Sequence, residues 1–129
     1  MAKNLNLAVE TFEAGSDLSA AQFQAVAYAA DGQVDLAGAA AVQVVGILQD
    51  NAGSAAGLAV QVGPALAGGV TKWKAGAAVA NGAFVTTDST GRCVLAGTTG
   101  NAIWGIAQSA AGAANEIISV KFGYLGLAL

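Results

Sequence analysis

The sequence predicts a small all-β domain, an antiparallel barrel or sandwich, that is built from two similar halves and preceded by an extended N-terminal arm. Three observations lead to this fold class. The chain repeats itself internally, its apolar segments are short and separated by glycine, and Ala contributes more than any other residue to its hydrophobic share of 55%, beside 18 Gly. Short strands with frequent turns suit such a composition better than long helices.

The repeat has a period of 59 residues. Shifting the chain by this amount places Gly32 on Gly91 and, without a gap, aligns further identities: Leu36-Ala37-Gly38 with Leu95-Ala96-Gly97, Gly46-Ile47 with Gly105-Ile106, Gln49 with Gln108, and Ala52-Gly53 with Ala111-Gly112. A repeat of this kind indicates one supersecondary unit used twice, each copy burying its apolar face against the other. The matching residues are glycines and aliphatic side chains, which indicates a scaffold.

A chain of 129 residues suits one domain with a single core. We expect an arm over residues 1–15 and a single β domain over 16–129. Within the domain we expect repeat one at about 16–63, a linker at 64–76, repeat two at about 77–123, and an apolar C-terminal tail at 124–129, which could cover a subunit face.

The arm carries the alternating pattern of an extended strand. Leu5, Leu7 and Val9 are separated by single residues of other types, which is a period of two. Because a terminal strand lacks a partner of its own, we expect it to pair with a sheet edge of a neighbouring molecule. The alternative is an unattached terminus.

The first repeat begins near Ser16–Ala20, a candidate helical turn. The segment that follows, Gln22–Ala29, fits either a helix that is capped by Asp17 or the first strand of a hairpin. The second repeat decides between them, because its partner segment Ala83–Thr87 is rich in β-branched residues and precedes the turn Asp88–Gly91. We therefore predict a strand.

The remaining strands follow in the same order in both repeats. We expect Asp31-Gly32 and Asp88–Gly91 to be turns, and Gly46 and Gly105 to mark bulges or sharp bends inside strands. The predicted strands are Gln33–Ala37, Val42–Gln49 and Ala59–Val62 in the first repeat, and Arg92–Ala96, Ala102–Gln108 and Ile117–Phe122 in the second.

Charge and apolar patterning exclude several classes of partner. The net charge is −3, and the five Lys and Arg residues form no basic stripe, so we expect no nucleic acid. The longest apolar stretch, Leu36–Leu48, is too short for a membrane helix, and the N-terminus lacks the apolar region of a signal peptide. Cys93 lies alone in an apolar run, where we expect a small buried hydrophobic residue.

The chain offers no evident catalytic set. It contains no His, which removes the usual general base, and its eight carboxylates are dispersed. The Gly53–Gly57 segment lacks the Lys of a phosphate-binding loop, and no cluster has metal-ligand spacing. We therefore predict a protein that is not an enzyme, with no cofactor, no metal and no small-molecule substrate, although a hydrolase with paired carboxylates stays an alternative.

Lys72-Trp73-Lys74 places an aromatic ring between two cations. The segment could anchor an anionic partner surface through the Trp73 ring. Alternatively it is an edge strand with Trp73 directed inward and both lysines outward, an arrangement that discourages unwanted strand pairing. Trp104 occupies the repeat position of Val45, which favours a place in the core or in a subunit interface.

With these patterns in place, the chain resembles the small capsid cement, or decoration, proteins of tailed bacteriophages. The resemblance runs through most of the chain. It is carried by DLSAAQFQAV and AADGQVDLAG within Asp17–Gly38, VVGILQDNA at Val44–Ala52, GGVTKWKAGAAVANGAFVTTDSTGR at Gly68–Arg92, and IWGIAQSAAGAANEIISVKF at Ile103–Phe122.

The resemblance implies a β-tulip-like fold and a homotrimer on the outer surface of the virion, made in the host cytoplasm. It implies the major capsid protein as partner, with the joints between capsid subunits as the place of binding. On this basis we expect capsid contacts at Leu5, Leu7, Val9, Phe12, Lys72, Trp73 and Lys74. The alternative is a non-catalytic β-domain that binds a carbohydrate or protein ligand through Trp73 or Trp104.

Overall fold

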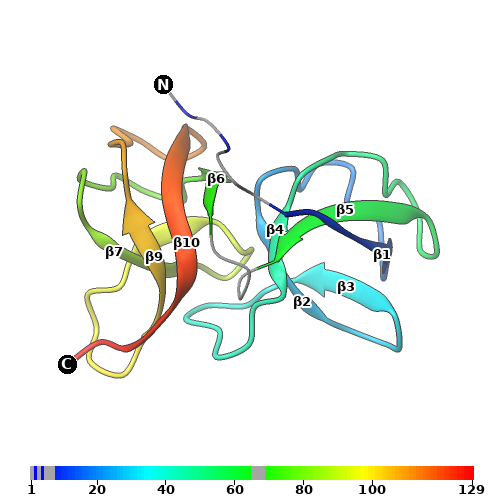
Figure 1. Cartoon of the computed structure of the whole chain (residues 1–129), viewed down its shortest axis with the longest axis horizontal. Helices are drawn as coiled ribbons and strands as arrows, with labels where there is room; N and C mark the ends of the chain where they lie inside the picture. Colours follow the sequence, from blue (N-terminus) through cyan, green and yellow to red (C-terminus); the bar gives the residue numbers. More distant parts are fainter. Residues whose placement is uncertain (1, 3, 5–7, 65–68) are drawn as a thin grey trace.

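The computed structural model describes residues 2, 4, 8–64 and 69–129, and this part of the chain contains β-strands and turns but no α-helix (Figure 1). No helix in it is therefore long and apolar enough to cross a membrane. The strands are β1 (Glu10–Ala14), β2 (Ala25–Tyr28), β3 (Gln33–Leu36), β4 (Gly46–Leu48), β5 (Ala59–Pro64), β6 (Val70–Lys74), β7 (Phe84–Thr87), β8 (Cys93–Leu95), β9 (Ala102–Ala107) and β10 (Ile117–Leu127).

The strands form two sheets, one from each half of the chain. The first is a closed barrel in the order β1-β3-β2-β4-β5, and the second is a five-stranded sheet in the order β6-β10-β9-β7-β8. Neighbouring strands pair antiparallel except β1 and β3, which pair parallel. In Figure 1 the two sheets lie side by side as two lobes. The predicted fold class, all-β from two similar halves, is confirmed.

The two sheets have the same strand order once corresponding strands are matched. Shifting β2 by 59 residues gives β7, and the sequence of neighbours in the second sheet then repeats that in the barrel. The difference is at the closing seam. Two residue pairs join β1 to β3 in the barrel, whereas a parallel bridge between Ala75 and Cys93 stands at the corresponding place in the second half. The repeat thus forms a closed barrel in the first half. In the second half it forms a five-stranded sheet whose two edge strands meet only through this isolated bridge.

Local conformations repeat as well. Phe23 and Gly82, which the shift superimposes, both have positive φ angles, of 64° and 82°. The backbone N–H of Phe23 donates to the Leu48 oxygen at 2.7 Å, and that of Gly82 donates to the Ala107 oxygen at the same distance. Gly32 and Gly91 also share a left-handed conformation, with φ of 71° and 78°, in the predicted turns. The duplicated sequence therefore encodes duplicated backbone geometry.

The glycines inside strands allow close approach of a neighbouring strand. A Cβ atom on Gly105 would stand 2.6 Å from the Lys121 backbone oxygen, and one on Gly46 would collide with the Gly63 backbone oxygen. A side chain at either place would push the adjacent strand away. Of the expected irregularities, the register shift lies on β10 between Phe122 and Gly126, close to Gly105 but not on it.

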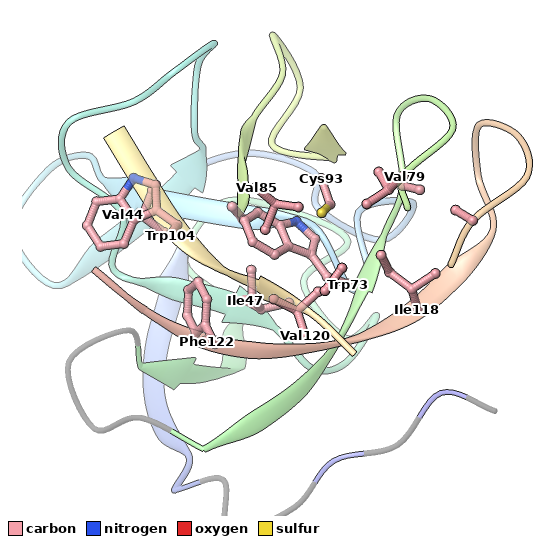
Figure 2. Packing of buried hydrophobic residues seen from close by; sticks show 14 of the residues in the cluster. Val44, Ile47, Trp73, Val79, Val85, Cys93, Trp104, Ile118, Val120 and Phe122 are labelled. Atoms are coloured by element: carbon pink, nitrogen blue, oxygen red, sulfur yellow. The ribbon is translucent and has the colours of Figure 1, made fainter. Parts of the chain in front are cut away.

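The core has two parts. One fills the barrel and is lined by residues of the first half, including Leu18, Val26 and Leu48. The other contains side chains from both halves, among them Ile47 from the first and Trp73 from the second. Figure 2 shows Trp73 surrounded by Val85, Val120, Ile47 and other apolar side chains. The cluster therefore crosses from one sheet to the other and packs the two halves together.

Cys93 belongs to the shared cluster and is fully buried, as expected. Its removal from water, together with the nearby negative charge of Asp88, raises the pKa of the thiol far above its ordinary value. The side chain therefore acts as a small apolar group at neutral pH.

Hydrogen bonds join the halves at the turn around Gly91. Its carbonyl oxygen accepts the backbone N–H of Ala25 at 2.7 Å and the indole N–H of Trp73 at 2.9 Å. Nearby, the Gln24 side-chain amide donates to the Thr90 oxygen at 2.7 Å. The turn Asp88–Gly91 of the second half thus lies against the start of β2 in the first half.

The structure corrects the boundaries of three predicted segments. The predicted arm over 1–15 includes β1, which pairs with β5 and β3 of its own chain, so Glu10–Ala14 belong to the barrel. The predicted linker at 64–76 contains β6, and the predicted tail at 124–129 is largely the end of β10. Under the 59-residue shift no residue of β1 is identical to its counterpart in the second half, so the repeat did not mark β1 or β6 as strands.

Two predicted strands are shorter than expected. The strand predicted at Gln22–Ala29 begins only at Ala25, because Gln22 and Phe23 form a turn with positive φ at Phe23. The strand predicted at Val42–Gln49 is reduced to Gly46–Leu48. The other predicted strands coincide with β3, β5, β7, β8, β9 and β10 within a few residues at each end.

Replacing Gly91 by Ala should destabilise the protein strongly. The residue has a positive φ, and its new Cβ would collide with the Ala25 backbone oxygen. Gly32→Ala is the matched control, because Gly32 has the same backbone conformation but open space around it. We expect Gly32→Ala to lower the free energy of unfolding by about 1–2 kcal/mol, and Gly91→Ala by at least about 2 kcal/mol more. Urea denaturation measures both; equal losses would contradict the role of this joint.

Candidate functional site

The predicted capsid contacts divide into two groups. Leu5 and Leu7 lie outside the described residues, and Val9 is half exposed just before β1. Phe12 lies within β1, packs partly against the barrel core and contacts Tyr28 edge-to-face, with ring centroids 6.0 Å apart. The structure therefore makes Phe12 part of the barrel wall, whereas Val9 stays accessible to a partner.

Trp73 is not a surface anchor, which corrects the prediction that it contacts the capsid. The side chain is 0% exposed, and its ring meets the Phe122 ring at a centroid distance of 5.5 Å. β6 stands at the end of its sheet, with Trp73 directed into the core and the flanking lysines partly exposed. The alternative interpretation, an edge strand with an inward Trp, is confirmed.

Lys72 and Lys74 are held against the first half of the chain. The Lys72 ammonium lies 5.5 Å from the centroid of the Phe23 ring, and the Lys74 ammonium is 3.4 Å from the Gln24 side-chain oxygen. The outer edge of β6 is also occupied. The backbone N–H of Lys72 donates to the Asn4 side-chain oxygen at 2.8 Å, and that of Lys74 donates to the Phe23 backbone oxygen at 2.7 Å.

An apolar groove borders the last strand. It has a volume of about 360 Å³ and lies among residues from β7, β9 and the end of the chain: Phe84, Ala96, Ile103, Leu127, Ala128 and Leu129. Tyr124 and Leu125, on the same strand, are about half exposed. Because charged residues are absent from this lining, the groove is suited to contact with another apolar protein surface.

A second hollow lies at the mouth of the barrel, with a volume of about 330 Å³. It is lined by aromatic and aliphatic side chains and by two polar ones: Glu10, Tyr28, Val42, Gln43, Val44, Val45 and Trp104. The Trp104 side chain is only 4% exposed and belongs to the shared core, as expected. In Figure 2 it lies beside Val44 at one end of the cluster.

A third hollow, of about 510 Å³, is open to solvent and has both apolar and charged residues in its lining. It lies between the two halves and includes Asp17, Gln24, Lys74 and Arg92. Its charged groups have partners within the chain. Hydrogen bonds from the side chain and backbone N–H of Ser19 lower the pKa of the Asp17 carboxyl, and Arg92 pairs with Asp88 at 2.9 Å.

Asp88 organises the turn that leads to Gly91, as the sequence predicts. Its carboxylate accepts the backbone N–H groups of Thr90 and Arg92 at 2.9 and 2.8 Å and the Arg92 side chain at 2.9 Å. Partial burial opposes ionisation of Asp88, but these hydrogen bonds outweigh it and hold the pKa of the carboxyl below its ordinary value. The ionised form is therefore a structural group in the turn.

The described residues contain no group of three or more His, Cys, Asp or Glu side chains that could hold a metal ion. The carboxylates of Asp17 and Asp88 are engaged in turns, and the Cys93 thiol is buried.

A search of solved structures finds a similar fold. The N base of the head fiber gp8.5 of bacteriophage phi29 matches with a TM-score of 0.63 and 17% sequence identity. The match covers 92% of this chain and 98% of the phi29 chain. At this identity the similarity establishes a shared fold. No family model and no curated protein matches the sequence.

Replacing Asp88 by Asn should remove part of the acid sensitivity of the protein. The pKa of Asp88 is lower in the folded state than in the unfolded chain, so its stabilisation is present above about pH 4 and is lost as the pH falls through the lower, folded value. We expect Asp88→Asn to lower the free energy of unfolding by about 1–2 kcal/mol at pH 7, and by less as the pH falls below about 4.

Asp31→Asn is the control for this measurement, because it removes the same charge from an exposed turn of the first half. At pH 7 the loss of stability should be larger for Asp88→Asn, because Asp88 accepts hydrogen bonds from Thr90 and Arg92. A constant loss for Asp88→Asn over this whole range would contradict the role of the ionised carboxylate.

Proposed function

We propose that this protein is a structural component of a bacteriophage virion. In this proposal it binds the outer surface of the capsid as a homotrimer and stabilises the joints between major capsid protein subunits. The observation that carries the proposal is the fold that it shares, over 92% of its length, with the base of a phage head fiber. The resemblance of its motifs to capsid decoration proteins supports the same assignment independently of the fold.

The surface composition supports attachment to larger partners. Only 10% of the residues are charged, and large apolar side chains stand exposed on both halves of the described chain. Burying such a surface against a partner removes apolar area from water and lowers the free energy of the protein. A trimer that touches several capsid subunits at once binds far more tightly than one protomer does, because the later contacts form at high effective concentration.

We assign the trimer contact to the apolar groove beside the end of β10. Leu125 and Leu127 lie on this strand, Leu129 follows it, and Phe84 of β7 lines the same groove. A patch on one copy that meets a different patch on the next closes into a ring when the rotation is one third of a turn. Three such contacts would bury the groove in each copy.

The capsid contact is assigned to the N-terminal side of the protein. Val9 is exposed in the described chain, and Leu5 and Leu7 continue the same alternation towards the N-terminus. Lys72 and Lys74 lie partly exposed near this side and can meet acidic groups at the rim of the contact. Trp73 and Phe12 have no part in this assignment, since one is buried and the other lies in the barrel wall.

Purified virions of the phage whose genome encodes this chain test the function. Quantitative mass spectrometry should find the protein in a fixed proportion to the major capsid protein, and particles that lack it should lose their genome at a lower temperature. Absence of the protein from intact particles would overturn the proposal.

Replacing Leu127 by Ser should weaken the trimer. The side chain is 54% exposed, so the protomer should fold as before while the groove loses apolar contact area. We expect the dissociation constant of the trimer to rise at least about tenfold, measured by sedimentation equilibrium. Leu58→Ser is the control, because Leu58 is 44% exposed but lies in the first half, away from the groove. Equal trimer stability in both variants would contradict the assignment of the contact.

A further inference from the structure

The hollow at the barrel mouth has the features of a built binding site. In β1 every second side chain lies on the same face, so Glu10, Phe12 and Ala14 share one face of the strand. Ala14 is fully buried in the barrel and Phe12 is half buried. Glu10 continues this row to the rim. On β2 the buried Val26 and the exposed Tyr28 stand in the same relation. Both strands thus bring an inward row of side chains out to the same opening.

The walls of this pocket are fixed by internal hydrogen bonds. The Trp104 indole N–H donates to the Ala41 backbone oxygen at 2.7 Å, so the ring is held in place. The Gln43 side-chain oxygen accepts the backbone N–H of Tyr28 at 3.2 Å. Tyr124 supports Trp104 from the second half, with ring centroids 5.1 Å apart. The pocket is therefore formed before any partner arrives, which reduces the entropy lost on binding.

The pocket carries a negative charge and no positive one. Glu10 is exposed at the rim, and the lining includes no Lys or Arg side chain. Within the described residues the ion pair present is Arg92–Asp88, and Glu10 takes no part in it. An unpaired carboxylate beside aromatic rings attracts a cation that can also contact the faces of the rings.

We propose that the barrel mouth binds an arginine side chain of a partner protein. The guanidinium would pair with the Glu10 carboxylate and stack against the exposed ring of Tyr28, while its methylene groups would contact Val42. Arginine fits better than lysine because its planar group makes paired hydrogen bonds to a carboxylate and stacks on aromatic rings. This assignment rests on the charge and the lining of the pocket and not on the capsid role.

A titration with short peptides tests this site. The probe is acetyl-Gly-Arg-Gly-amide, and its neutral isostere carries citrulline in place of arginine. The chain has two Trp residues, so a ¹H–¹⁵N correlation spectrum should contain two indole signals, one from Trp104 in the pocket wall and one from the fully buried Trp73. We expect the arginine peptide to shift the Trp104 signal with saturation in the millimolar range, to leave the Trp73 signal in place, and to bind at least about fivefold more tightly than the citrulline peptide.

Glu10→Gln should weaken binding of the arginine peptide about fivefold or more. Glu13→Gln is its matched control, because Glu13 is exposed on the opposite face of the same strand and carries the same charge. The assignment is overturned by a Trp104 signal that does not move, by equal binding of the two peptides, or by equal loss in the two variants. Saturable binding of methyl glucoside without binding of the arginine peptide would also overturn it and would identify a carbohydrate site. These outcomes concern the pocket alone, whereas the composition of virions concerns the capsid role.

Discussion

The contact between the two halves of the protein is centred on one backbone carbonyl, that of Gly91. The oxygen of Gly91 accepts hydrogen bonds from Ala25 in the first half and from the Trp73 indole in the second, and the absence of a side chain at Gly91 lets the Ala25 backbone lie against it. The shared apolar cluster packs around this joint. Because the joint fixes the angle between the sheets, it also fixes the barrel mouth, whose wall contains Trp104 from one half and Tyr28 from the other.

The repeat made much of this fold predictable. Short strands bounded by glycine recur at a fixed shift, and β2, β3, β7 and β8 fall where that shift places them. β1 and β6 were harder to find because they carry few of the repeated residues, and their partners in the sheet lie far away in the sequence. A pattern local to the chain identifies a strand but does not identify the strand that pairs with it.

The functional surfaces were less predictable for the same reason. In a strand, the order Lys72-Trp73-Lys74 places the Trp73 ring and the two lysines on opposite faces. The sequence does not show which of these faces meets the core, and that decides where the ring points. The barrel mouth combines residues from β1, β2, the segment before β4, and β9. No motif links these positions, since only the closure of the barrel and the joint between the halves bring them together. Sequence reasoning had no signal with which to find Glu10.

The reactivity of the single cysteine, Cys93, can report local opening of the second sheet. The backbone of Cys93 forms the isolated β-bridge to Ala75 that joins the two edge strands of the second sheet, and its sulfur is buried. A thiol with a raised pKa inside a packed cluster does not react with alkylating reagents until the surrounding strands separate. Its rate of labelling therefore reports how often that seam opens, without any dye or engineered residue.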